Sequence, residues 1–301
     1  MRSRIEATQT LTAVELDRGD TLEFVRRDGH VVSIVVRETG AEVLRTDLDE
    51  LKVQQRGAVT EMRFRCVLEV EGEEVELVRE LCTERAFYEP WEIAGVRIWF
   101  DAVDDLFEFM DETHGPCRPR KHVRLALQDA SLRICPETVH PWCPLPVEGL
   151  DIRECYNGDD CWMGGYFGAS AHGGLDINHP RGTPIWAPFD LDDQWFFNTK
   201  EEHGNNRWRG VRRWADGSEW VIQVHHVTRL HVDEHVPVRA GSHYADGAGV
   251  AVGMHDHSHF VFKVVRDGEA VLIDPWILFW QMYRDHPERT GACFYRRAET
   301  G

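Results

Sequence analysis

Histidine is concentrated in one part of this sequence. Twelve of the 16 histidines lie between His140 and His259. Because a neutral imidazole binds metals and carries protons near neutral pH, this clustering indicates a metal site or a proton-transfer site. Some of these histidines need no chemical role, and we interpret five as solvated: His140, His179, His203, His235 and His243. The others fall into three groups.

The first group is the pair His172 and Asp176, in the segment AHGGLDINHPRGTPIWAPF. The two glycines between them disfavour a helix. On an extended strand, residues four positions apart share a face, so we expect both side chains on one side. Gly173 and Gly174 would leave room there for an ion. A histidine and an aspartate at this spacing are more often incidental than metal-binding, so the pair needs partners.

The second group is GMHDHSHFVFKV, in which His255, His257 and His259 alternate along a predicted strand. Alternate residues of a strand point to one face. Buried imidazoles without partners are costly, so a cation or a hydrogen-bonding network is expected to hold them. The alternative, an accidental histidine-rich hairpin, is weakened because HFVFKV continues as a core strand.

The third group is VIQVHHVTRLHV, again a strand pattern, with His225, His226 and His231. His225 and His226 are adjacent, so at most one of them is expected to face a given site. Either is equally compatible with a surface position.

Together these groups offer the donors of a catalytic zinc site. Two imidazole nitrogens and one carboxylate oxygen form a three-ligand set, which leaves a fourth tetrahedral position for water. The groups contain no cysteine, which argues against a closed structural zinc site and against an iron–sulfur cluster. The predicted cofactor is Zn²⁺.

The elements around these groups are predicted to be strands. In the first part, TLEFVRRDGHVVSIVV turns at Asp28-Gly29 and MRFRCVLEVEGEEVELV turns at Glu71-Gly72, which predicts two hairpins. WEIAGVRIWF adds a strand pair or a bent strand, DAVDDLFEFMDE has helical spacing, and HVRLALQDASLRI returns to strand alternation. Residues 1–135 are therefore predicted to form an antiparallel β-domain.

A proline-rich stretch, CPETVHPWCPLPVEG, follows this domain and predicts an extended linker over residues 136–150. Beyond it, short strands resume, with turns at Asp216-Gly217 and Asp267-Gly268 and almost no helix before Ile277. A second β-domain is predicted over residues 151–301.

The second domain resembles the lysostaphin-type (LytM) zinc metallopeptidases, which share the duplicated-hybrid-motif β-fold. HGGLDI followed by GTPIWA is similar to the family's HxGxDI and GTPV motifs, HSHFVFKV to its HLHFEV, VTRLHV to its YAHL, and LIDPW to the DP after its last strand. The resemblance covers about residues 164–276. It implies a mainly β chain whose catalytic domain is a sheet or barrel-like structure of this type.

Residue by residue, the resemblance implies that His172, Asp176 and His259 bind the zinc and that His231 and His257 form the catalytic pair beside it. It gives His255 no role. The implied activity is that of an endopeptidase acting on peptidoglycan stem or cross-bridge peptides. This sequence departs from the family where MHD replaces the glycine-rich turn before HSH, and at Val261, where a glutamate is usual.

Two other functions stay open. Fold and metal set do not dictate the substrate, so a zinc enzyme that cleaves a polysaccharide is the first alternative, and the tryptophans from Trp142 onward would suit sugar stacking. The second alternative is a binding or regulatory module that retains the site without turnover. The resemblance does not extend to residues 1–135, and the sequence does not specify the oligomeric state.

Composition limits the classes of molecule that this chain is expected to bind. The net charge of −18, from 52 acidic and 34 basic residues, argues against nucleic acids and anionic membranes. Neither a continuous apolar signal segment nor a membrane span of about 18 apolar residues is present, which predicts a cytoplasmic location, although the family is usually exported. Cys155 with Cys161, or Cys135 with Cys143, could close small loops, but we expect buried free thiols.

Overall fold

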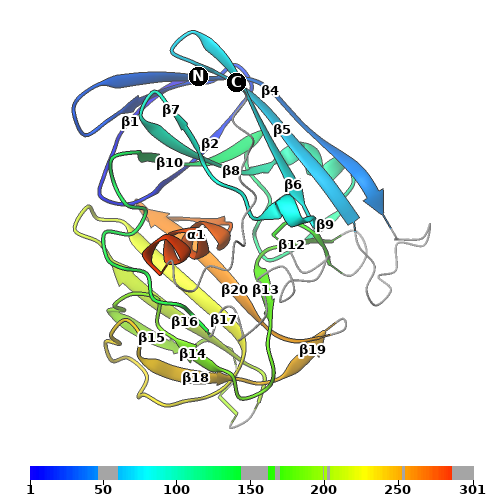
Figure 1. The fold of residues 1–301 in the computed structure, drawn as a ribbon, viewed down its shortest axis with the longest axis vertical. Coiled ribbons are helices and arrows are strands. Elements are labelled where there is room, and N and C mark those ends of the chain that lie inside the picture. Colours follow the sequence, from blue (N-terminus) through cyan, green and yellow to red (C-terminus); the bar gives the residue numbers. More distant parts are fainter. Residues whose placement is uncertain are drawn as a thin grey trace.

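The computed structural model describes residues 1–46, 60–143, 162–166, 170–198, 200–201, 204–252 and 255–286. Several predictions fall outside this part of the chain: those on residues 144–150 of the linker, Cys155, Cys161, His203 and the side chain of His255. The described chain is mainly β-structure, with one α-helix, α1 (Trp276–Asp285), near its end (Figure 1). The predicted fold class is thereby confirmed.

A five-stranded sheet in the order β1-β3-β4-β5-β6 forms the outer layer of the first part. Its strands are β1 (Arg2–Glu6), β3 (Thr21–Val25), β4 (Val31–Thr46), β5 (Thr60–Val70) and β6 (Glu73–Leu81). The pairs β3–β4 and β5–β6 are the two predicted hairpins. Glu71 and Gly72 have φ of 52° and 86°, the left-handed backbone of a two-residue hairpin turn. The predicted antiparallel pairing has one exception at the edge of this sheet, where β1 pairs with β3 in parallel.

A four-stranded sheet in the order β2-β10-β8-β7 lies beneath this layer. Its strands are β2 (Thr12–Leu16), β7 (Trp91–Ile93), β8 (Val96–Val103) and β10 (Val123–Asp129). Every residue of β8 is buried, because its side chains meet neighbours on both faces. Phe100 contacts Phe64 of β5 at 6.3 Å between ring centroids, and Trp99 contacts Trp280 of α1 at 5.1 Å. Short 3-10 helices, η1 (Glu84–Ala86) and η2 (Asp104–Glu108), join the strands, the second within the segment predicted to be helical.

A nine-stranded sheet dominates the second part. Its central path runs through β13 (Leu175–Asn178), β20 (His255–Arg266), β17 (Glu219–Leu230), β16 (Asn206–Arg213) and β15 (Asp193–Phe196). Four more strands attach to this path: β14 (Pro184–Trp186), β18 (His243–Gly247), β19 (Val250–Val252) and β21 (Glu269–Ile273). The predicted turns at Asp216-Gly217 and Asp267-Gly268 lie between β16 and β17 and between β20 and β21, and both are confirmed.

A small three-stranded sheet, β11-β12-β9, connects the two parts. It consists of β9 (Glu112–His114), β11 (Gly165–Tyr166) and β12 (Ser170–His172). The first part supplies β9, which pairs in parallel with β12, and both lie between the upper and lower sheets in Figure 1. The metal-site candidates thus lie next to the junction of the two parts.

The two parts also share buried contacts. Arg79 of β6 forms an ion pair with Asp274, both side chains being almost fully buried. The indole Nε1 of Trp276 donates to the carbonyl oxygen of Tyr88 at 3.0 Å. The described end of the predicted linker is packed as well, since Trp186 N donates to Trp142 O at 2.7 Å and Trp142 is buried. The predicted domain boundaries stay a prediction. The buried residues of the two parts form one hydrophobic cluster.

Two further expectations concern the whole chain. Cys66, Cys117 and Cys135 are buried free thiols, as predicted. Within the described part of the chain, no helix has the length and apolar character needed to cross a bilayer.

Candidate metal centre

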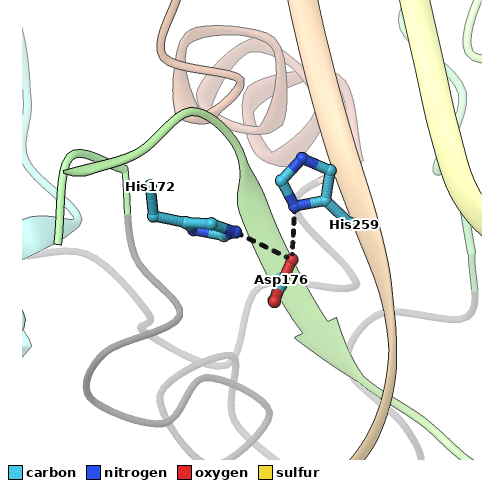
Figure 2. A group of neighbouring side chains, drawn as sticks. All are labelled: His172, Asp176 and His259. Carbon is cyan, nitrogen blue, oxygen red and sulfur yellow. Dashed lines mark hydrogen bonds and ion pairs between the residues drawn. The ribbon is translucent and has the colours of Figure 1, made fainter. Parts of the chain in front are cut away.

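His172, Asp176 and His259 come together where β12, β13 and β20 meet (Figure 2). Asp176 and His259 are opposite each other in the antiparallel pair β13–β20. His259 Nδ1 lies 2.8 Å from Asp176 Oδ1, and His172 Nε2 lies 3.6 Å from the same oxygen. One carboxylate oxygen therefore faces two imidazole nitrogens.

Two glycines shape the backbone between these side chains. His172 ends β12 and Asp176 lies in β13, so the expectation that both share one strand is wrong. Gly173 and Gly174 form the connection, and Gly173 N donates to His114 O at 2.9 Å. A Cβ atom on Gly174 would lie 2.2 Å from the ring of His259. This glycine lets His259 approach the chain, which is how the sequence brings the three donors together.

Burial makes the charge of Asp176 depend on its neighbours. Its side chain is almost fully buried, which by itself disfavours the carboxylate. The imidazoles of His172, His257 and His259 outweigh this burial and hold the pKa of Asp176 well below its usual range. Asp176 is therefore ionised at neutral pH, as a metal ligand must be.

The donor set fits a zinc ion. One ligand atom from each of His172, Asp176 and His259 lies within 4.8 Å of the other two, and all three side chains are buried. Two imidazole nitrogens and a carboxylate oxygen are the ligand types of three-ligand zinc sites, which keep a fourth position for water or substrate.

His257 lies directly beside this triad. Its Nε2 is 3.2 Å from Asp176 Oδ2, the second oxygen of the carboxylate. His257 and His259 thus approach the same aspartate from alternate positions of β20, which confirms that these two share a face.

His225 and His226 both reach the site, so the prediction that only one would face it is wrong. The ring of His225 lies 4.7 Å from that of His259, and the ring of His226 lies 4.8 Å from that of His257. Strand alternation fails because His226 has φ of 63° and is skipped in the pairing of β17 with β16, where Arg207 pairs with His225 and Asn206 with Val227. Such irregularities re-aim side chains near functional sites.

His226 is an uncharged histidine at neutral pH, and its side chain is fixed by one neighbour. Burial lowers its pKa to about 3, assisted by the neighbouring His257. Its Nδ1 lies 2.8 Å from Asn205 Oδ1. A proton on Nδ1 satisfies that oxygen and leaves the lone pair on Nε2.

The structure places His231, the other residue predicted to be catalytic, in a second group. His231 Nε2 lies 2.9 Å from Asp246 Oδ2, and Asp246 Oδ1 lies 2.6 Å from His243 Nε2. The histidine ring that lies beside His257, at 4.8 Å between centroids, is that of His226. His243, interpreted as solvated, is half-exposed but bonded to Asp246.

Sequence reasoning missed His114. This residue of β9 stacks on His172 with ring centroids 5.9 Å apart, and its ring lies 5.7 Å from that of His259. Burial and the nearby His259 lower its pKa. His114 lies outside the residues that carry the motif resemblance, and the parallel pairing of β9 with β12 is what reveals its position.

Comparisons with known proteins give the following results. The sequence matches no protein-family model and no curated protein. Similar solved structures are peptidases of the M23 and lysostaphin type. Lysostaphin from Staphylococcus simulans is 17% identical over 55% of this chain and 56% of that chain, with a TM-score of 0.31. The match therefore spans little more than half of the lysostaphin chain.

Two further structures cover different shares of the chain. The catalytic domain of the prophage-encoded M23 protein EnpA from Enterococcus faecalis is 19% identical over 44% of this chain and 95% of that chain, with a TM-score of 0.30. A zinc-containing peptidase from Vibrio cholerae is 13% identical over 87% of this chain and 83% of that chain, with a TM-score of 0.31.

Proposed function

We propose that this protein is a zinc-dependent endopeptidase that acts on peptidoglycan-like peptides. The observation that carries the proposal is the convergence of His172, Asp176 and His259, with ligand atoms within 4.8 Å of one another, beside the histidines His226 and His257. A buried three-donor set with adjacent imidazoles suits hydrolysis better than a closed structural site.

His172 Nε2, Asp176 Oδ1 and His259 Nδ1 are the atoms that would hold the ion. A zinc ion bound there supplies Lewis acidity, which polarises the scissile carbonyl and makes a bound water acidic. The three ligand side chains are buried, so they are shielded from bulk water. This strengthens their electrostatic attraction for a cation.

His226 and His257 would handle the protons. With its Nδ1 proton directed at Asn205 Oδ1, His226 presents a lone pair on Nε2, and we assign it the role of accepting a proton from the attacking water. His257 Nε2 lies 3.2 Å from Asp176 Oδ2, which orients the ring beside the three ligands, and we assign His257 the role of stabilising the developing oxyanion. We therefore propose His226 in the role that motif resemblance gives to His231.

The substrate class rests on the motifs HGGLDI, GTPIWA and HSHFVFKV, which resemble those of lysostaphin-type peptidases. Lysostaphin is described as an antimicrobial peptidase and the Vibrio cholerae protein as a zinc-containing peptidase. A peptide bond is the bond we expect this chain to cleave.

Digestion of purified peptidoglycan tests the proposal. The full-length protein, loaded with one or more equivalents of zinc, should release new amino groups, and chelator or the substitution Asp176→Asn should abolish the release. Asp193→Asn is a matched control, because Asp193 bonds His235, an exposed histidine, and not the triad. New reducing sugar ends without new amino groups would overturn the peptidase proposal. Unchanged amine release in Asp176→Asn would overturn the metal site.

A further inference from the structure

A second group of metal-binding side chains lies outside the triad. His231 follows the end of β17, and His243 and Asp246 lie in β18. One ligand atom from each lies within 4.8 Å of the other two. The Asp246 carboxylate sits between the imidazoles, with one oxygen 2.9 Å from His231 Nε2 and the other 2.6 Å from His243 Nε2.

We propose that His231, His243 and Asp246 form a second site for a divalent transition-metal ion, independent of the proposed catalytic zinc. The ion would join the end of β17 to the start of β18 and so close the segment of residues 231–243. Zn²⁺ is the ion we expect, because two imidazoles and a carboxylate suit it better than they suit Mg²⁺ or Ca²⁺.

The backbone already holds the three residues in place. Leu230 and Ala245, next to His231 and Asp246, are partners in the β17–β18 pair. His231 N donates to Tyr244 O at 2.7 Å, and Thr228 Oγ1 donates to Asp246 O at 3.2 Å. Only side-chain rotation is needed to turn both Nε2 atoms toward one ion, so little ordering entropy opposes binding.

Charge and exposure also favour a cation. The half-exposed rings leave the remaining coordination positions open to water. The net charge of −18 raises the local concentration of cations around the chain.

The position suggests a structural role for this second ion. Ala248 N, two residues beyond Asp246, donates to His226 O at 2.7 Å. A metal ion bound by residues at β17 and β18 would therefore fix the register of this strand pair, and β17 carries His226.

Zinc stoichiometry distinguishes this site from the catalytic one. The full-length protein is stripped with chelator, reloaded with zinc chloride, passed over a desalting column and analysed for bound zinc. We expect two ions per chain in the parent, one in His243→Ala, one in Asp246→Asn and one in Asp176→Asn. His235→Ala is the control. It removes an exposed histidine that contacts Asp193, which belongs to neither proposed site, and it should keep two zinc ions per chain. Circular dichroism establishes that each variant is folded.

The outcomes separate the two proposals. If His243→Ala and Asp246→Asn, both folded, bind as many ions as the parent, the second site is overturned. One ion in the parent, lost in Asp176→Asn but kept in His243→Ala, overturns the second site and leaves the catalytic zinc intact. One ion lost in His243→Ala but kept in Asp176→Asn supports the second site and removes the metal from the proposed function.

Discussion

His226 reaches the metal centre through an unusual backbone conformation. With φ of 63° it departs from strand geometry and turns its ring to within 4.8 Å of His257. A left-handed conformation in a residue other than glycine costs about 1–3 kcal/mol, and outside turns it is a recurrent feature of functional sites. This strain supports a functional role for His226.

Substitution of His226 tests its proposed role. His226→Ala should lower kcat by roughly 10²–10⁴-fold, because it removes a general base, and should leave the zinc content unchanged. His231→Ala is compared with it, since His231 is the candidate from the motif VTRLHV, and this variant should lose only the second zinc ion. Peptidoglycan digestion and zinc analysis of both variants provide the measurement. A larger loss of activity in His231→Ala than in His226→Ala would contradict the assignment to His226.

Buried histidines make stability depend on pH in a defined direction. Burial lowers the pKa of His114 and His225 below the ordinary 6.5 and that of His226 to about 3. Between the folded and unfolded pKa values the unfolded chain binds more protons, so stability is complete above about pH 6.5 and falls as the pH drops toward 3. Within that pH range, each such buried histidine lowers the free energy of unfolding by about 1.4 kcal/mol for every pH unit of acidification.

Denaturant unfolding of the metal-free protein at pH 7.0 and 5.0 measures this effect. The free energy of unfolding should be lower at pH 5.0, and the difference should shrink in His226→Gln, which keeps a polar side chain that does not titrate. Equal stability at the two pH values would show that these histidines are not buried as neutral groups.

Motifs and structure contribute differently at this scale. The resemblance identifies His172, Asp176, His257 and His259, and the structure brings their side chains together. Alternation along a strand misjudges His226, because a pairing irregularity depends on the neighbouring strand and leaves no periodic signal in its own sequence.

At the scale of elements, the connection between β12 and β13 controls the site. Gly174 has no side chain, and a Cβ there would meet ring atoms of His259 at 2.2 to 2.9 Å. We expect Gly174→Ala to displace His259 and to lower zinc affinity by about 10-fold or more, as loss of a ligand's positioning does. Gly40→Ala is the control, because Gly40 lies in β4 with nothing within 4 Å of an added Cβ. Competition with a chromophoric chelator gives the affinities. Equal affinities in the two variants would contradict this account.

The hairpins were predictable because their turns carry local signals. Asp28-Gly29, Glu71-Gly72, Asp216-Gly217 and Asp267-Gly268 each end in a glycine with positive φ. The pairing of β9 with β12 was not predictable from the sequence, since a parallel pair between distant segments has no turn to mark it. His114 was missed for this reason.

At the scale of the whole molecule, the first and second parts of the chain are joined by buried polar contacts. Arg79 of β6 and Asp274, which precedes α1, form a buried ion pair, and Arg79 also donates to Asp101 O at 2.7 Å. Trp280 Nε1 donates to a carboxylate oxygen of Glu89 at 2.6 Å. Composition and turn signals predict two β-domains, but the Arg79–Asp274 and Glu89–Trp280 contacts join residues 195 and 191 positions apart, beyond the reach of local patterns.

Removal of one partner of the buried Arg79–Asp274 ion pair tests how much the contacts between the two parts contribute to stability. Arg79→Ala leaves Asp274 buried without its counter-charge and should lower the free energy of unfolding by about 3–5 kcal/mol. Arg37→Ala breaks a largely exposed pair with Glu69 and should cost under about 1 kcal/mol. Denaturant unfolding followed by tryptophan fluorescence gives both values. Similar losses in the two variants would indicate that the interface between the parts contributes little to stability.

The most direct test of the central claim is anomalous X-ray diffraction at the zinc absorption edge, from crystals of the zinc-loaded full-length protein. The account predicts an anomalous peak within bonding distance of His172 Nε2, Asp176 Oδ1 and His259 Nδ1, at roughly 2.0–2.2 Å from each atom. A fully loaded crystal that shows no peak between these three side chains would contradict the metal centre on which the proposed function rests.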